Sequence, residues 1–305
     1  MVARVTNQSV IDFTEENLIK VPNEDVLHKF IFESQNVRGE IVTLGPSWQT
    51  LLERRAYPQA MIEVLGELSV AALLLSATIK IDGTLALQYR GTTGIQLLVA
   101  EVFNTNRFRS MAKWDESLDG QSTQPNLLRE GTLAVTITQD NLKQSYQGIV
   151  DTQQQTVQEA LAHYMAQSEQ IPTRLWLAAN AQNAAGLMIQ KIPGVPDQDA
   201  DAWNRISQLA STISKHELLE LAPQQLLRRL FHEETMRVFD PNQIEFSCKC
   251  SESRTTNMLR SLGEEEVREI LDEKASVDIT CDFCGKNYIY SEAGVDRIFS
   301  ESSLN

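Results

Sequence analysis

Cysteine is absent from the first 247 residues of this 305-residue chain; the four cysteines, Cys248, Cys250, Cys281 and Cys284, all lie in its last fifth. A chain this long, with so little cysteine over most of its course, is not a disulfide-stapled miniprotein. Its 42% hydrophobic and 22% charged residues are ordinary globular usage, which excludes a wholly disordered chain. The fold must therefore depend on a hydrophobic core, and cysteine chemistry is confined to one end.

Long hydrophobic runs and an excess of positive charge are also missing. The longest stretch of nearly membrane-like character, Leu68 to Ile79, has 12 residues, whereas a spanning helix needs about 20. No signal peptide is visible at the N-terminus, so we expect a cytoplasmic protein whose thiols are kept reduced. The 27 basic and 41 acidic residues give a net charge of −14, which disfavours binding to nucleic acids and to anionic membranes.

Enzyme motifs are equally scarce. The sequence Gly91-Thr92-Thr93-Gly94 lacks the Lys-Ser/Thr of a phosphate-binding loop, and no Gly-x-Ser-x-Gly nucleophile motif occurs. The histidines share no metal-ligand spacing; they are His28, His163, His216 and His232. His232 could support a metal ligand, but a solvated helix residue is favoured. We therefore do not expect an enzyme.

The region from about Val37 to Ile192 mixes strand and helix patterns. Apolar spacing predicts a long buried helix over Pro58 to Ile79 and a second helix over Val157 to Gln167. Asp82-Gly83, between two short strand-like runs at 79–81 and 85–89, predicts a hairpin. Further strands are expected at 95–103, 133–138, 146–150, 175–179 and 187–192. This pattern favours an α+β class with a mainly antiparallel sheet and packed helices.

A break in the pattern divides the chain. The sequence Ile192-Pro193-Gly194-Val195-Pro196-Asp197 interrupts helix and strand alike. The next residues have helical apolar stripes, formed by Trp203, Ile206, Ala210 and Ile213 and then by Leu226, Leu227, Leu230 and Phe231. This segment is too short to enclose its own core. We expect an N-terminal α+β domain (1–193), a helical linker (194–243) and a C-terminal cysteine-containing module (244–305).

The four cysteines have metal-ligand spacing. Cys248-x-Cys250 and Cys281-x-x-Cys284 are two close pairs separated by 30 residues, and Gly285 follows the second pair. Two such pairs can surround one tetrahedral Zn²⁺, so one zinc per chain is expected. The alternative, a thioredoxin-like redox motif at Cys281, needs a helix that starts at the motif. The flanking runs 277–280 and 288–290 instead predict a strand hairpin.

Zinc in a module of about 60 residues would have consequences for stability. Core burial alone makes such a module marginal, and structural zinc can supply about 10–16 kcal/mol. Disulfides within Cys-x-Cys or Cys-x-x-Cys close very short loops and constrain the unfolded chain little. They could not replace the metal, so oxidation would act as an unfolding switch.

Motifs along most of the chain resemble a known family. In the tail they are the sequences from Phe246 to Ser251, Leu259 to Glu265 and Cys281 to Tyr288; earlier they are 65–67, 80–83, 97–101, 146–150 and 167–173. This pattern is similar to the redox-regulated heat-shock holdase family, often called the 33 kDa chaperonin family. The four cysteines are the specific part of the resemblance.

The resemblance implies an ATP-independent holdase that prevents aggregation of unfolding client proteins under oxidative stress. It implies activation by thiol oxidation, zinc release and linker unfolding, and a homodimer when oxidised. Because neighbouring thiols have the highest effective concentration for each other, we expect the disulfides Cys248–Cys250 and Cys281–Cys284. The alternative is a constitutive zinc-ribbon adaptor or nucleic-acid-binding protein, which the acidic charge supports poorly.

Overall fold

The computed structural model describes residues 24–33, 35–79, 83–92, 94–115, 128, 131–139, 145–152, 156–194 and 199–300. By its internal contacts the chain divides into two compact units, Met1–Phe246 and Ser247–Asn305. Each unit has its own hydrophobic core. The two units are therefore described separately.

The first sheet of the larger unit is antiparallel, with strand order β10-β1-β2-β9-β8. β1 lies between β2 on one side and, on the other, two short strands from the end of the expected linker, β10 and β11. The strands are β1 (Val26–Phe32), β2 (Val37–Leu44), β8 (Thr173–Ala179), β9 (Ala184–Lys191), β10 (Met236–Val238) and β11 (Asn242–Gln243). Residues about 200 positions apart in the sequence thus share one sheet.

The second sheet has the order β12-β5-β4-β3-β6-β7 and is antiparallel except for the parallel pair β12–β5. Its strands are β3 (Gly83–Gly91), β4 (Ile95–Phe103), β5 (Arg107–Trp114), β6 (Gly131–Gln139), β7 (Ser145–Thr152) and β12 (Glu245–Phe246). The expected hairpin at Asp82-Gly83 is wrong, because β3 is paired on both edges by β4 and β6. Residues 80–82 of that prediction lie outside the described residues.

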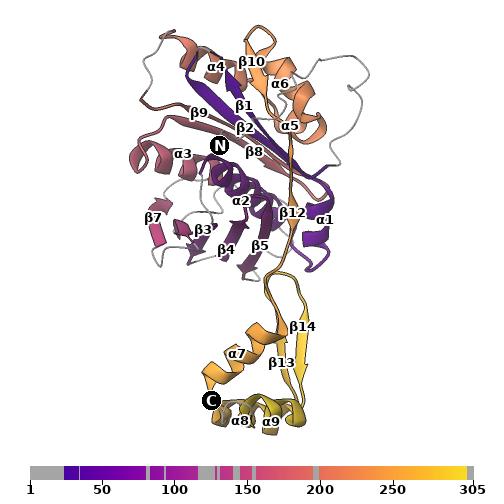
Figure 1. Cartoon of the computed structure of the whole chain (residues 1–305). Helices are drawn as coiled ribbons and strands as arrows, with labels where there is room; N and C mark the ends of the chain where they lie inside the picture. Colours follow the sequence, from indigo (N-terminus) through magenta and orange to yellow (C-terminus); the bar gives the residue numbers. More distant parts are fainter. Residues whose placement is uncertain are drawn as a thin grey trace, which may run out of the picture. The chain divides into compact units, whose positions relative to one another are not determined.

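Helix α2 (Gln59–Thr78) lies between the two sheets (Figure 1). Its contacts with β2, β8 and β9 on one side and with β3, β4 and β5 on the other explain why it is apolar on all sides. It is long and apolar enough to cross a membrane, but 72% of that window is buried inside the protein, as in a core helix. Helices α1 (Pro46–Leu52) and α3 (Val157–Gln167) flank it.

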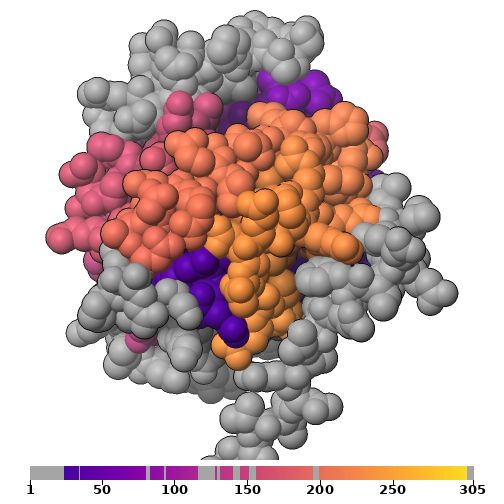
Figure 2. Space-filling model, turned by 90° about the horizontal axis from the view of Figure 1, so that it is seen from above, coloured from indigo at the N-terminus to yellow at the C-terminus, as the bar shows by residue number. Residues whose placement is uncertain are grey.

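Three short helices of the expected linker cover the other face of the first sheet. They are α4 (Ala202–Ala210), α5 (Lys215–Glu220) and α6 (Pro223–Phe231). Figure 2 shows these residues spread over that side of the unit. A second hydrophobic cluster joins them to the sheet; its fully buried members are Phe30, Phe32, Val37, Ile41, Ala178, Ala185, Leu187, Ile189, Ala202, Ile206, Ala210, Leu218, Leu219, Leu226, Leu227, Leu230, Phe231 and Val238. The apolar stripes predicted from the sequence thus face the N-terminal sheet.

Polar contacts at the rim of this interface also join the linker to the N-terminal region. Glu234 accepts hydrogen bonds from Arg205, at 2.7 Å, and from the amide of Gln35 on the β1–β2 turn. The ammonium of Lys215 lies 3.0 Å from the carboxylate of Glu67 on α2. The side chains of the basic partners, Arg205 and Lys215, are 37% and 73% exposed, so the apolar cluster supplies most of the stabilisation.

A buried histidine lies beneath the same interface. The ring of His28 on β1 contacts the carbonyl of Phe239 through Nδ1, at 3.3 Å, and the amide of Gln224 on α6 through Nε2, at 3.2 Å. Burial holds the pKa of His28 below its usual value.

The smaller unit contains three helices and a two-stranded hairpin among its described residues, 247–300. They are α7 (Glu252–Leu262), α8 (Glu264–Lys274), β13 (Val277–Thr280), β14 (Asn287–Tyr290) and α9 (Glu292–Ser300). The predicted hairpin over 277–280 and 288–290 is confirmed. Eight buried side chains form the core: Leu259, Val267, Leu271, Val277, Tyr288, Tyr290, Val295 and Ile298.

The architecture confirms the α+β class, with antiparallel sheets and packed helices. By contacts the helical linker is part of the larger unit, whose last residue is Phe246. The three-part division at 193 and 243 stays a prediction, since packing alone does not separate the linker from the sheet that it covers.

Docking of the linker can be tested at Ile206, which is fully buried in the second cluster. Ile206→Asp would bury a charge, at a cost of several kcal/mol, and should release α4 and α6 from the sheet. Trypsin cleavage after Arg228 and Arg229 in α6 should then be more than about tenfold faster. The control Gln208→Asp places the same charge at an exposed position of the same helix and should leave the rate unchanged. Equal rates in both variants would contradict the docking.

Candidate metal centre

Two separate segments of the smaller unit carry the cysteines. Cys248 and Cys250 lie in the extended segment before α7, and Ser251 caps that helix by accepting a hydrogen bond from the backbone N–H of Arg254. Cys281 and Cys284 lie in the turn between β13 and β14. The cap fixes where the first segment enters the helix, and the hairpin fixes the position of the second segment.

The turn at Cys281 has the hydrogen bonds of a metal-binding knuckle. The backbone N–H of Cys281 donates to the carbonyl of Lys286, at 3.0 Å, and the N–H of Gly285 donates to the carbonyl of Cys281, at 2.8 Å. Gly285 has φ +66°, a left-handed conformation that glycine adopts without strain. The flanking strands exclude the thioredoxin-like alternative, which needs a helix at this point.

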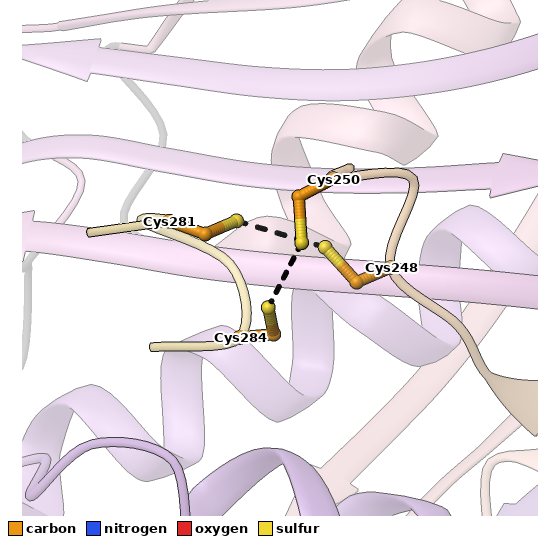
Figure 3. A group of neighbouring side chains, drawn as sticks. All are labelled: Cys248, Cys250, Cys281 and Cys284. Carbon is orange, nitrogen blue, oxygen red and sulfur yellow. Dashed lines mark hydrogen bonds between the residues drawn. The ribbon is translucent and has the colours of Figure 1, made fainter. Parts of the chain in front are cut away.

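The four sulfur atoms converge on one point (Figure 3). Cys248 Sγ lies 3.6 Å from Cys281 Sγ, and Cys250 Sγ lies 3.4 Å from Cys284 Sγ; all four are within 4.8 Å of one another. Sulfurs at about 2.3 Å from a tetrahedral Zn²⁺ are about 3.8 Å apart. The cluster therefore has the size and the donor set of a four-thiolate metal site.

Several of the sulfurs also accept hydrogen bonds from nearby groups. The backbone N–H groups of Cys250 and Lys286 donate to the sulfurs of Cys248 and Cys284. The sulfur of Cys250 accepts a hydrogen bond from a side chain, the hydroxyl of Tyr288, at 3.3 Å. Such contacts orient ligand sulfurs and reduce the repulsion between thiolates.

Burial and the close approach of the sulfurs oppose ionisation of this cluster in the absence of a cation. Burial raises the pKa of the Cys284 thiol and that of Cys248. Burial also disfavours the thiolate of Cys250, but the hydroxyl of Tyr288 and the other three thiols donate hydrogen bonds to it and lower its pKa to about 7. Four thiolates at this spacing need a cation, because only a bound charge offsets their repulsion and burial.

Among the described residues this is the single group of three or more metal-ligating side chains whose ligand atoms converge. The predicted exposure of His232 is confirmed: its side chain is 66% exposed and lies 3.8 Å from Glu233, in the other unit. The sequence pattern did not indicate that Tyr288 is part of the centre. Its position four residues after Cys284 in a predicted strand was visible, but nothing in the sequence indicated where its hydroxyl points.

Comparisons with known proteins point to one family. The family model described as "Hsp33 protein" matches residues 25–291. The chain is 44% identical over 278 residues to the "33 kDa chaperonin" of Methylobacillus flagellatus, covering 90% of this chain and 94% of that one. It is 41% identical over 279 residues to the "33 kDa chaperonin" of Chromobacterium violaceum, covering 91% and 94%.

A solved structure has the same fold. The crystal structure of the 33 kDa chaperonin from Thermotoga maritima superposes with a TM-score of 0.79 at 21% sequence identity, covering 92% of this chain and 100% of that one. At that identity the likeness shows the fold alone.

Metal binding at the centre can be tested with Co²⁺, which reports thiolate ligands by absorbance. Titration of the reduced protein should give one equivalent per chain, with thiolate charge-transfer bands and tetrahedral d–d bands. Cys281→Ser should weaken binding by more than about tenfold and change both band sets. Loading should also weaken as pH falls, since protons compete for the thiolates. Full loading of Cys281→Ser with unchanged spectra would contradict a four-thiolate site.

Proposed function

This chain belongs to the Hsp33 protein family and is a heat-shock chaperone, and we propose that the redox state of its four-cysteine centre switches its activity. Reduced, it is an inactive, metal-bound protein; oxidised, it is a holdase that binds unfolding proteins without ATP and performs no catalysis. The observation that carries this proposal is the convergence of four thiols in a unit with a core of eight buried side chains.

In the reduced state, one Zn²⁺ per chain is held by the thiolates of Cys248, Cys250, Cys281 and Cys284. The size of the cluster and its all-sulfur donor set fit this metal. The small core leaves the unit marginal by burial alone, so the metal supplies much of its folding free energy, on the order of 10 kcal/mol. Loss of zinc then means loss of the fold of this unit.

Oxidation removes the ligands by joining them in the disulfides Cys248–Cys250 and Cys281–Cys284. The folded cluster does not select this pairing, because the close contacts Cys248–Cys281 and Cys250–Cys284 join sulfurs from different segments. Once the metal has left and the unit has opened, proximity along the chain decides, and it favours the neighbours in each pair. The short loops do not restore the fold.

Unfolding of the smaller unit is transmitted to the linker through the chain. Strand β12, which follows the linker directly and pairs with β5, ends at Phe246, two residues before Cys248. The linker and the metal centre are therefore joined by a very short stretch of chain. The helices α4, α5 and α6 have nine, six and nine residues and are unstable in water without packing. Undocking exposes the apolar side of the first sheet and of the linker to client proteins.

The proposed function implies the binding partners of this protein. They are unfolded or aggregation-prone client proteins and, in the oxidised state, a second copy of the chain in a homodimer. The compartment is the cytoplasm, where reduced thiols are the resting state. Nucleic acids and membranes are not partners, in keeping with a net charge of −14.

The switch predicts a gain of activity on oxidation. Zinc-loaded, reduced protein should not suppress aggregation of a thermally unfolding client, whereas protein treated with peroxide at mild heat should suppress it at near-stoichiometric ratios. Ile206→Asp should give partial suppression without oxidant, and Gln208→Asp should give none. Equal suppression before and after oxidation in the parent protein would indicate a constitutive zinc-ribbon protein instead.

The same oxidised samples test the disulfide pairing. Peptide mapping should find mainly Cys248–Cys250 and Cys281–Cys284, with zinc released in step with their formation. A majority of Cys250–Cys284 or Cys248–Cys281 links would mean that the disulfides form within the folded cluster and would overturn the proposed pairing.

A further inference from the structure

Tyr288 differs from the other hydrogen-bond donors to the sulfurs. Its hydroxyl, on strand β14, donates a hydrogen bond to Cys250 Sγ at a distance of 3.3 Å. Apart from the cysteine thiols themselves, the donors to Cys248 and Cys284 are backbone N–H groups, which every sequence supplies. The contact to Cys250 therefore depends on the identity of one side chain.

The surroundings of Tyr288 fix this contact. The residue is 8% exposed and belongs to the core of the unit, so packing holds its ring in place. The ammonium of Lys286 lies over the ring, 4.9 Å from its centroid. A cation at that position draws electron density from the ring and makes the phenol a stronger hydrogen-bond donor.

A hydrogen bond to a thiolate sulfur engages a lone pair that the sulfur needs in order to attack an oxidant. The bond lowers the nucleophilicity of the sulfur and its donor strength toward a metal, as hydrogen bonds do at other metal–thiolate centres. We propose that Tyr288 is a positioning residue that protects Cys250 from oxidation and so sets the oxidant level at which the centre opens. This inference rests on the proposed redox function and concerns its threshold.

The protected step can be written for a peroxide. The Cys250 thiolate attacks one peroxide oxygen, the O–O bond breaks, and the sulfur becomes a sulfenic acid as hydroxide leaves. A second cysteine thiolate then attacks the sulfenic sulfur, a disulfide forms and a second hydroxide leaves. Two thiolates have lost two electrons in total and the peroxide has gained them. Tyr288 acts on the first attack, where the free lone pair on Cys250 is required.

The chain offers a matched control two residues away. Tyr290 is on the same strand, is 7% exposed and belongs to the same core, but its hydroxyl is hydrogen-bonded to the hydroxyl of Thr255 and not to a sulfur. Tyr288→Phe and Tyr290→Phe each remove one buried hydroxyl from the unit. Only the first removes a contact to the metal centre.

The experiment uses the full-length, reduced, zinc-loaded protein and both variants. Hydrogen peroxide is added in excess and zinc release is followed with a chromophoric chelator. Release from Tyr288→Phe should be about three- to tenfold faster than from the parent, the range expected for one hydrogen bond to a charged group. Tyr290→Phe should release zinc at the parent rate. A rise of the same size in Tyr290→Phe would mean that unit stability, not the contact, controls release, and would overturn the proposal.

The absorption spectra of the Co²⁺-loaded proteins give a measurement that does not depend on the stability of the unit. In the Co²⁺-loaded proteins, the thiolate-to-metal charge-transfer band of Tyr288→Phe should lie at longer wavelength than that of the parent, because a sulfur freed of its hydrogen bond is a stronger donor. Tyr290→Phe should keep the parent band. An unchanged band together with an unchanged release rate in Tyr288→Phe would refute the assignment.

Two further comparisons distinguish failure of the role of Tyr288 from failure of the proposed redox function. If Tyr288→Phe does not fold, Lys286→Gln, at an exposed position, should shift both readouts in the same direction by a smaller amount; parent values for it would then overturn the proposal. If the parent protein itself holds no zinc, or keeps it in peroxide, the redox function fails. A parent that releases zinc while Tyr288→Phe behaves identically rejects only the role of Tyr288.

Discussion

Four sulfur atoms within 4.8 Å of one another cannot all carry a negative charge unless a cation lies among them. The rest of the smaller unit depends on this constraint, because its core has eight buried side chains, two of them tyrosines whose hydroxyls need polar partners. A unit of this size gains little from burial, so on the proposed function the metal that offsets the charge of the thiolates would also hold the helices and the hairpin together. Oxidation of these thiolates would then act directly on the folding of the unit.

The larger unit has two hydrophobic cores and would not unfold as a whole when the metal is lost. Its first core surrounds α2 between two sheets and involves none of the linker helices. The second core joins the linker to the opposite side of the first sheet, and its residues would be apolar surface if the linker left. On the proposed function, the linker would leave the first sheet while the first core stays folded. The chaperone would then expose apolar surface without unfolding as a whole.

Much of the fold and of the metal site could be predicted from the sequence, because the patterns that indicate them are local. The helix α2 and the strand β4 follow from apolar runs of the right length, and the cysteine spacing is itself the signal for the metal site. The prediction of a hairpin at Asp82-Gly83 was wrong, because a turn-forming dipeptide does not indicate which strands pair with β3 on its two edges. Strands β10, β11 and β12 have two or three residues each and exist only through pairing with distant strands. The contact between Tyr288 and Cys250 joins residues 38 positions apart, and no local pattern indicates it.

Hydrogen exchange tests the central claim most directly, because it reports on both cores and on the metal unit in one sample. In reduced, metal-loaded protein, amides of α4, α6 and α7 should all be protected. After oxidation, the amides of these helices should exchange rapidly, while those of α2, β2 and β9 keep their protection. Retained protection of α4 and α6 in fully oxidised, metal-free protein would show that the linker does not respond to the centre, and would contradict the account.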